Sequence, residues 1–150
     1  MTALENVLVA AVFGNRKAIA DPQAWAEELL EFVKFAMPRD TLARNLNTVQ
    51  LKRLDLARAL ASNPELLLLD EIAAGLTPGE LLELMDLVRK IREERSVTII
   101  LVEHVMKVIM GICDRVAVLH YGQKIAEDTY DEVSKDKKVI DAYLGEKYLL

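Results

Sequence analysis

The run Leu66–Leu69 is the feature of this sequence that most constrains its fold. Four leucines stand together with no polar residue between them, and Asp70 and Glu71 end the run abruptly. An apolar run without alternation is typical of a strand in a parallel sheet that is covered on both faces. A second run, Val97–Val102, is rich in β-branched residues and predicts another buried strand.

A helix is expected between these two strands. Thr77 and Pro78 supply an N-cap and a first-turn proline, and residues 79–94 carry apolar side chains at helical spacing. A strand–helix–strand unit is almost always right-handed, with parallel strands. The crossover therefore predicts that the acidic pair after the first strand shares one rim of the sheet with Glu103 and His104, which follow the second.

Longer helices are expected upstream of this unit. Residues 22–36 form an amphipathic helical pattern that Pro38 ends, and residues 49–61 form another, with Asn47 as the expected N-cap. Residues 1–13 are apolar and leave strand and helix open. The upstream part of the chain is thus expected to be mainly helical.

Shorter elements are expected downstream. They are a helix over 105–112, a strand over 115–120, its hairpin partner over 123–126, and helices over 129–134 and 136–144. The whole pattern predicts an α/β fold in which a helical subdomain precedes a parallel βαβ core with a small C-terminal hairpin and helices. We expect the helical subdomain and its flanking segment over 1–62 and the α/β part over 63–150.

Composition excludes several classes of protein. The net charge is -5 and only 5% of residues are aromatic, so the charge and stacking surfaces of a nucleic-acid binder are missing. The apolar runs are far shorter than the roughly 20 residues that a membrane span requires. The start does not have the pattern of a secretory signal. A single cysteine fits a reducing, cytosolic compartment.

Two acids and a histidine on one rim suit a site for magnesium and phosphate. One carboxylate can hold the ion, a second can orient an attacking water, and an imidazole can contact a transferred phosphoryl group. Polar residues also begin simply where a buried strand reaches the surface. The spacing alone leaves both interpretations open.

The residues from Leu66 to Glu71 resemble the Walker B strand of an ATP-binding cassette (ABC) ATPase. The resemblance implies that Asp70 binds magnesium, that Glu71 polarises the attacking water, and that His104 is the switch histidine. It places residues 73–77 at the D-loop position. These matches occur in the family's order, and the resemblance spans nearly the whole chain.

The signature motif of the family is altered here. Residues 46–50 occupy its position, and the helix that follows is similar to the family's. The resemblance implies nucleotide contacts at Asn47, Gln50 and Thr77. Thr48 and Val49 stand where the family has small residues, so they add β-carbons where backbone amides approach the γ-phosphate.

A phosphate-binding loop is missing from the 150 residues. Its pattern has two glycines five positions apart, followed by lysine and serine or threonine, and no pair of glycines in this sequence has that spacing. The resemblance therefore implies the C-terminal part of a P-loop cassette, with roughly its first third absent. We expect the chain alone to be inactive.

Residues 73–76, 103–106 and 142–146 most resemble the branched-chain amino-acid transport ATPases. The resemblance implies a partial nucleotide-binding subunit of an importer, on the cytoplasmic face of the cell membrane. Intact relatives use ATP and Mg²⁺, and pair with a transmembrane permease and a second ATPase subunit. The alternatives are a non-catalytic interaction module, a lipopolysaccharide-export ATPase, and a metal-dependent hydrolase using Asp70, Glu71 and His104.

The isolated chain is also expected to self-associate. Both predicted strands are apolar on both faces, so each needs a covering layer and neighbouring strands. Without the missing part of the cassette, some apolar surface and at least one strand edge lie open. Open edges and apolar patches favour pairing with another chain.

Overall fold

The computed structural model describes residues 1–15 and 18–144. The chain forms two compact units, Met1–Val102 and Glu103–Leu150. The expected division after residue 62 marks a change from helical to α/β sequence, and it stays a prediction. Among the described residues, no helix combines the length and the apolar character needed to cross a membrane.

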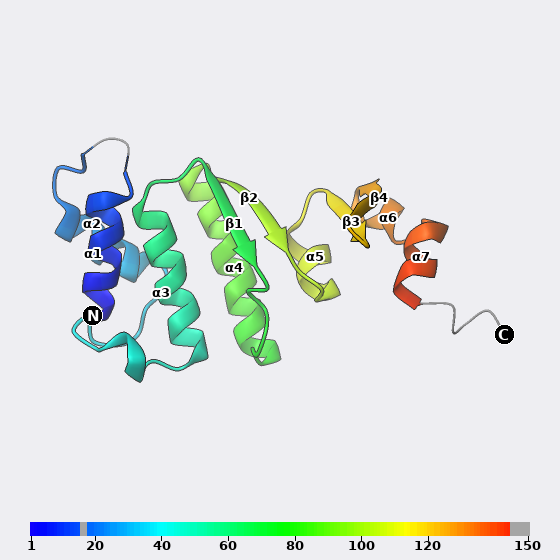
Figure 1. Cartoon of the computed structure of the whole chain (residues 1–150). Helices are drawn as coiled ribbons and strands as arrows, with labels where there is room; N and C mark the ends of the chain where they lie inside the picture. The colour runs from blue at the N-terminus through cyan, green and yellow to red at the C-terminus, as the bar shows by residue number, and fades with distance from the viewer. Residues whose placement is uncertain (16–17, 145–150) are drawn as a thin grey trace. The chain divides into compact units, whose positions relative to one another are not determined.

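Three helices form a layer at the start of the first unit: α1 (Ala3–Phe13), α2 (Pro22–Phe32) and α3 (Thr48–Ala61) (Figure 1). A short 3₁₀ helix, η1 (Ala43–Asn45), precedes α3. The open choice for residues 1–13 resolves as helix. Thr2 and Glu5 form a capping box there, and Ala3, Val7 and Ala11, four residues apart, are all buried.

Helix α2 ends four residues before the expected end at residue 36, so that boundary was wrong. Lys34 takes a left-handed conformation with φ 55°. The amide of Lys34 donates to the carbonyl of Glu31 (2.8 Å), and the amide of Phe35 donates to that of Leu30 (2.9 Å). This pair of hydrogen bonds is a Schellman motif, which closes the helix well before the proline at position 38.

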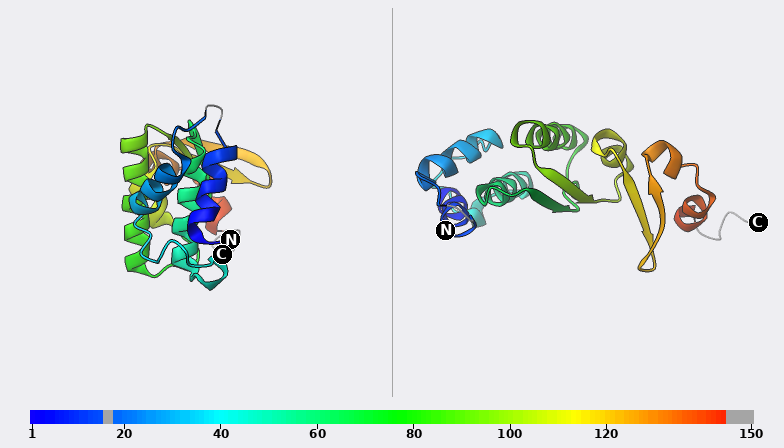
Figure 2. Two further views of the ribbon diagram at one scale, coloured as in Figure 1. Left: turned by 90° about the vertical axis from the view of Figure 1, so that its left-hand side faces the viewer. Right: turned by 90° about the horizontal axis from the view of Figure 1, so that it is seen from above.

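The expected βαβ unit is confirmed. Strands β1 (Leu66–Asp70) and β2 (Thr98–Val102) are parallel and joined by α4 (Pro78–Arg95). Helix α4 lies along one face of the two strands (Figure 2). Its apolar side chains Leu84, Leu87, Val88 and Ile91 are buried.

The other face of the two strands is open. Leu67 and Leu69 are buried, whereas Leu66 and Leu68 are exposed, so burial alternates along β1. The expectation that both strands are buried on both faces was therefore wrong for these residues. The physical reason is that α4 covers one face, whereas Leu66, Leu68 and Ile100 on the opposite face stay exposed among the described residues, in line with the expectation of open apolar surface.

The second unit holds the expected hairpin. The described elements are α5 (Met106–Ile112), β3 (Val116–His120), β4 (Gln123–Asp128), α6 (Tyr130–Val133) and α7 (Lys137–Leu144). Strands β3 and β4 are antiparallel. Tyr121 and Gly122 both have positive φ at the turn, which matches a two-residue hairpin. Strand β4 is two residues longer than expected.

Candidate functional site

Asp70 and Glu71 lie at the carboxyl end of β1, as the sequence predicts. Both side chains are exposed. Asp70 is the register partner of Val102 in β2, and the amide of Glu71 donates to the carbonyl of Val102 (2.9 Å). The two carboxylates thus stand where the parallel pair ends, which is where ligands bind in open α/β sheets.

The backbone of Glu71 is held in an uncommon conformation. Its φ is 45°, in the left-handed region that residues other than glycine rarely adopt. Its carbonyl accepts from the amide of Ala74 (3.2 Å) and from Nζ of Lys52 (3.4 Å). Strained backbone of this kind clusters at functional sites. The sequence does not predict the left-handed backbone of Glu71, because glutamate has no preference for this conformation.

The N-terminus of α3 is capped as expected. The side chain of Asn47 accepts from the amide of Gln50 (3.0 Å), and the side chain of Gln50 accepts from the amide of Asn47 (3.0 Å). This reciprocal pair is a capping box. Both side chains are therefore bound to their own helix, and their expected contacts with nucleotide stay predictions.

Thr48 lies beside the D-loop position. A β-carbon added at Gly75, whose φ is +76°, would stand 3.9 Å from Cγ2 of Thr48. The altered signature and the D-loop segment are therefore neighbours in the first unit. Thr48 and Gly75 are both exposed.

Thr77 caps α4 through a second capping box. The amide and the hydroxyl of Thr77 both donate to Oε2 of Glu80 (2.7 Å each), and the amide of Glu80 donates to the Thr77 hydroxyl oxygen (3.4 Å). The hydrogen bond from the Thr77 backbone, followed by the one from its side chain, lowers the pKa of Glu80 below its usual value. The expected nucleotide contact of Thr77 stays a prediction.

His104 belongs to the second unit. Its amide donates to Oε2 of Glu103 (3.2 Å), and its side chain is exposed. Glu103 follows Val102, the register partner of Asp70, directly in the chain. The expected meeting of His104 with Glu71 stays a prediction.

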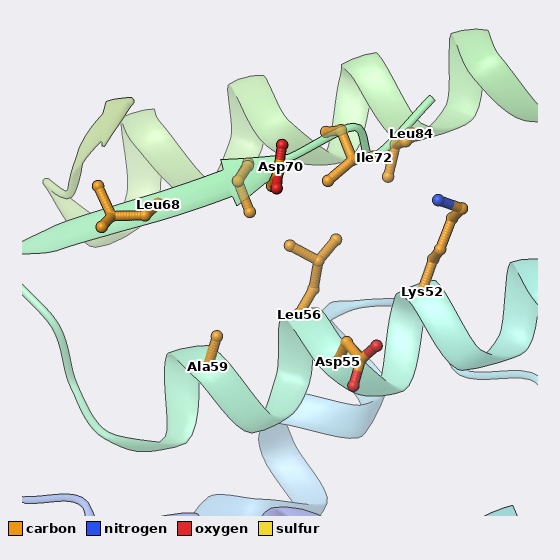
Figure 3. A pocket seen from close by; sticks show the side chains of 9 residues that line it. Lys52, Asp55, Leu56, Ala59, Leu68, Asp70, Ile72 and Leu84 are labelled. Atoms are coloured by element: carbon orange, nitrogen blue, oxygen red, sulfur yellow. The ribbon is translucent and has the colours of Figure 1, made fainter. Parts of the chain in front are cut away.

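A groove separates α3 from β1 (Figure 3). It has a volume of about 280 Å³. Leu56 and Ala59 of α3 and Leu68 of β1 give it an apolar lining; Lys52 lies toward one end, and Asp70 lies between Leu68 and Ile72. Sequence reasoning missed this groove, because nothing in the α3 sequence shows which of its faces lies beside β1.

Asp70 and Glu71 can bind magnesium only together with ligands from outside the chain, such as water molecules and substrate phosphates. Within residues 1–15 and 18–144, no group of three or more histidine, cysteine, aspartate or glutamate side chains could hold a metal ion. Mg²⁺ is usually bound by one or two carboxylates, several waters and the phosphates of a substrate. Two exposed carboxylates at a strand end supply the protein share of such a site.

Comparisons with known proteins agree with this geometry. The family model of the branched-chain amino acid ATP-binding cassette transporter matches residues 123–148. LivG of Salmonella typhimurium, a high-affinity branched-chain amino acid transport ATP-binding protein, is 39% identical over 160 residues. That match covers 97% of this chain and 63% of LivG, so the chain spans less than two thirds of this relative's length.

Solved structures of ATP-binding cassettes are also similar to this chain. The ADP conformation of MJ1267, an ATP-binding cassette of an ABC transporter, superposes with a TM-score of 0.79 at 29% identity, over 97% of this chain and 63% of MJ1267. The cassette MJ0796, solved as a dimer bound to ADP and Pi, gives a TM-score of 0.75 at 29% identity, over 86% of this chain and 56% of MJ0796.

The fold is therefore part of an ABC ATPase fold, as the sequence predicts. By sequence and fold, the chain corresponds to part of an ABC transporter ATP-binding protein. Within that family it is similar to the branched-chain amino acid transport ATPases over nearly its whole length.

Proposed function

We propose that this chain forms the magnesium- and water-handling part of the nucleotide-binding subunit of an importer for branched-chain amino acids. The observation that carries the proposal is the placement of Asp70 and Glu71 at the end of a parallel strand, in a chain 39% identical to LivG over 97% of its length. Intact relatives would couple ATP hydrolysis to import.

Each residue of the site has a proposed role. Asp70 holds magnesium, which when bound with nucleotide neutralises charge on the phosphates. Glu71 orients and polarises the attacking water, and its fixed backbone limits where the carboxylate can reach. His104 contacts the transferred phosphoryl group. Asn47, Gln50 and Thr77 contact nucleotide held by a second ATPase subunit.

Nucleotide binding by this chain alone should be weak. The 150 residues contain no phosphate-binding loop, which supplies the lysine and most backbone donors to the phosphates. The capping box at Asn47 and Gln50 also uses the amide of Gln50 for the helix itself. Thr48 and Val49 add bulk beside that amide. We infer that the chain turns over ATP only as part of a larger assembly.

The proposed partners are a transmembrane permease and a second ATPase subunit, which places the chain at the cytoplasmic face of the cell membrane. Branched-chain amino acids are the proposed cargo because the family model and LivG both carry that description. The lipopolysaccharide-export alternative predicts the same site chemistry with another permease. Pull-down with each type of permease separates the two.

The experiment combines the chain with a separately expressed portion of LivG that carries its phosphate-binding loop. Magnesium-dependent ATPase activity is measured for the mixture and for each part alone. We expect activity in the mixture only, and we expect Glu71→Gln to abolish it. Glu65→Gln is the matched control, because Glu65 is an exposed carboxylate at the opposite end of β1.

Two results would contradict the proposal. One is full activity of the Glu71→Gln mixture, which would remove Glu71 from the chemistry. The other is micromolar Mg-ATP affinity of the isolated chain in isothermal titration, which would show that the phosphate loop is dispensable. An inactive mixture that still binds a permease would favour the non-catalytic interaction module.

A further inference from the structure

The peptide groups on either side of the Glu71 α-carbon are held by separate parts of the first unit. The amide of Glu71 donates to the carbonyl of Val102 at the end of β2 (2.9 Å). The carbonyl of Glu71 accepts from the amide of Ala74 in the turn (3.2 Å) and from Nζ of Lys52 in α3 (3.4 Å). Sheet, turn and helix therefore converge on the glutamate that is proposed to orient water.

The left-handed backbone of Glu71 requires such support. Its φ of 45° is unfavourable for a residue with a β-carbon, and conformations of this kind persist where the surroundings over-determine them. Backbone groups of Val102 and Ala74 make two of the contacts, and any residue type at those positions other than proline at 74 would supply them. Lys52 makes its contact with a side chain, so a substitution can remove that contact and leave the others in place.

Helix α3 holds Lys52 in place because the next residue, Arg53, ties the helix to its neighbours. Nη1 of Arg53 donates to the carbonyl of Val33 (2.7 Å), and Nη2 pairs with Oε2 of Glu83 in α4 (2.6 Å). In Figure 3, the Lys52 side chain points from α3 toward the segment that carries Ile72, the residue after Glu71. Two adjacent cations of α3 thus contact the βαβ unit at different points.

Lys52 shares its helix with the altered signature. Asn47, the N-cap of α3, precedes Lys52 by five residues, which is about 7.5 Å along a helix axis. Asn47 and Gln50 are proposed to contact nucleotide. A displacement of the start of α3 would therefore also displace the ammonium group that holds the Glu71 carbonyl.

We propose that Lys52 is a positioning residue for Glu71. Its ammonium group fixes the Glu71 carbonyl, and the orientation of that peptide sets the direction in which the carboxylate leaves the backbone. In this role Lys52 acts through Glu71 and touches neither water nor nucleotide. A misplacement of about 1 Å can cost roughly a hundredfold in rate, so a modest contact can matter for catalysis. The proposal rests on the proposed function and adds to it a residue that sets the geometry of the same site.

Three variants test the role of Lys52. Lys52→Met removes the charge and keeps a side chain of similar length, whereas Lys52→Arg keeps a cationic donor. Arg58→Met is the matched control, because Arg58 is a cation on the same helix whose ion pair with Asp55 (3.0 Å) stays within α3.

The first measurement is amide hydrogen exchange, followed by NMR on the 150-residue chain without nucleotide. In Lys52→Met, we expect the amides of Glu71 and Ala74 to exchange roughly fivefold faster, because one hydrogen bond that fixes this turn is lost. The amide of Thr98, which donates to the Glu65 carbonyl at the other end of β1 (3.0 Å), should exchange at the parent rate. Lys52→Arg and Arg58→Met should match the parent at all three amides.

The second measurement is ATPase activity in the mixture with the loop-bearing LivG portion. Lys52→Met should lower kcat roughly tenfold and leave KM for ATP unchanged, because Glu71 acts in the chemical step and not in nucleotide binding. Lys52→Arg should restore kcat, and Arg58→Met should not change it. The urea midpoint of each variant should equal that of the parent, since the Lys52 contact is exposed.

Several results would overturn the proposal. Parent-like exchange of Glu71 and Ala74 in Lys52→Met would show that Lys52 does not hold this turn. Faster exchange that includes Thr98, together with a lower urea midpoint, would make Lys52 a general structural contact. Parent-like kcat in Lys52→Met would remove its positioning role and leave the proposed function intact. A mixture without ATPase activity would instead contradict the proposed function, and exchange in the chain alone would still decide whether Lys52 holds Glu71.

Discussion

The helical layer and the β1–β2 pair use the same kinds of side chain but differ in how completely those side chains are covered. In the layer formed by α1, α2 and α3, Val7, Leu29 and Leu30 are fully buried between helices. On the strands, Leu66 and Leu68 are as apolar, yet Leu66 is 48% exposed and Leu68 is 67% exposed. The layer is closed by elements of this chain, and the sheet is closed on one face only.

This difference separates two sources of stability. Full burial of a leucine side chain contributes roughly 1.5–3 kcal/mol. Leu29 receives that contribution within the unit, whereas Leu68 receives most of it only when another layer covers the sheet. The helical layer therefore stabilises the first unit, whereas the open face of the sheet contributes little to its stability.

The largest predicted effect is the difference in stability loss between two leucine-to-alanine variants, one in the helical layer and one on the open face of the sheet. Leu29→Ala should lower the free energy of unfolding by about 2–5 kcal/mol, because it leaves a cavity between helices. Leu68→Ala should change it by less than about 0.5 kcal/mol, because the side chain is 67% exposed. Urea denaturation followed by circular dichroism measures both. Equal losses would show that the open face is covered in solution.

The second effect concerns the contact that joins the helical layer to α4. The guanidinium of Arg95 lies 5.0 Å from the ring centroid of Trp25 and 4.6 Å from that of Phe32, and it pairs with Glu28 at 2.8 Å. Arg95→Ala should lower the free energy of unfolding by about 1–2 kcal/mol, because two cation–π contacts and an ion pair are lost.

Arg58→Ala is the control for Arg95. The side chain of Arg58 makes an exposed ion pair with Asp55 one turn away, so its removal should cost about 0.5 kcal/mol or less. Comparable losses for the two arginines would mean that the Arg95 contact does not hold the layer to the α4 helix.

The sequence predicted what local chemistry decides. The βαβ order, the caps at Asn47 and Thr77, and the hairpin turn at Gly122 follow from residue types at fixed spacing, and all are confirmed. The helix end at Lys34 and the left-handed Glu71 could not be predicted, because these residues have no intrinsic preference for positive φ.

The surroundings of the site, meaning which side chains near it are exposed and where a groove forms, could not be predicted from the sequence. Leu66 and Leu68 are exposed because of which layers the chain supplies. A run of four leucines has the same sequence pattern whether the strand is covered on one face or on two. The groove between α3 and β1 likewise depends on how a helix and a strand pack, which no single motif encodes. The roles of Asp70 and Glu71 rest on the resemblance, and the structure adds their exposed position.

The third predicted effect compares one helix cap in the helical layer with one in the helix that covers the sheet. Asn47→Ala and Thr77→Ala should each lower the free energy of unfolding by about 1 kcal/mol at neutral pH. Only the Thr77 cap has a titrating partner. Hydrogen bonds from Thr77 lower the pKa of Glu80, so this stabilisation is present above the usual glutamate pKa and is lost as pH falls through the folded pKa.

Urea titrations at pH 7 and near pH 3 check the cap prediction. The penalty of Thr77→Ala should shrink in acid relative to that of Asn47→Ala, because Asn47 is capped by Gln50, which does not titrate. A Thr77→Ala penalty that is independent of pH would show that the hydrogen bond from the Thr77 hydroxyl to the Glu80 carboxylate contributes nothing to the cap.

The smallest predicted effect lies at the end of the sheet, where stability and proposed chemistry oppose each other. Glu71 has φ 45°, which costs a residue with a β-carbon roughly 1–2 kcal/mol, whereas glycine loses about 0.5–1 kcal/mol through its freer unfolded chain. Glu71→Gly should therefore raise the free energy of unfolding by about 0.5 kcal/mol. Glu65→Gly, at the bend just before β1 and without positive φ, should lower it by a similar amount. The same Glu71→Gly change should abolish ATPase activity in the mixture with the LivG portion, since the carboxylate is gone. Changes of opposite sign in the free energy of unfolding for Glu71→Gly and Glu65→Gly, with ATPase activity lost only in Glu71→Gly, would show that the left-handed backbone is retained for the position of the carboxylate. A Glu71→Gly variant that is less stable than the parent would show instead that the glutamate side chain makes a structural contact that the site needs.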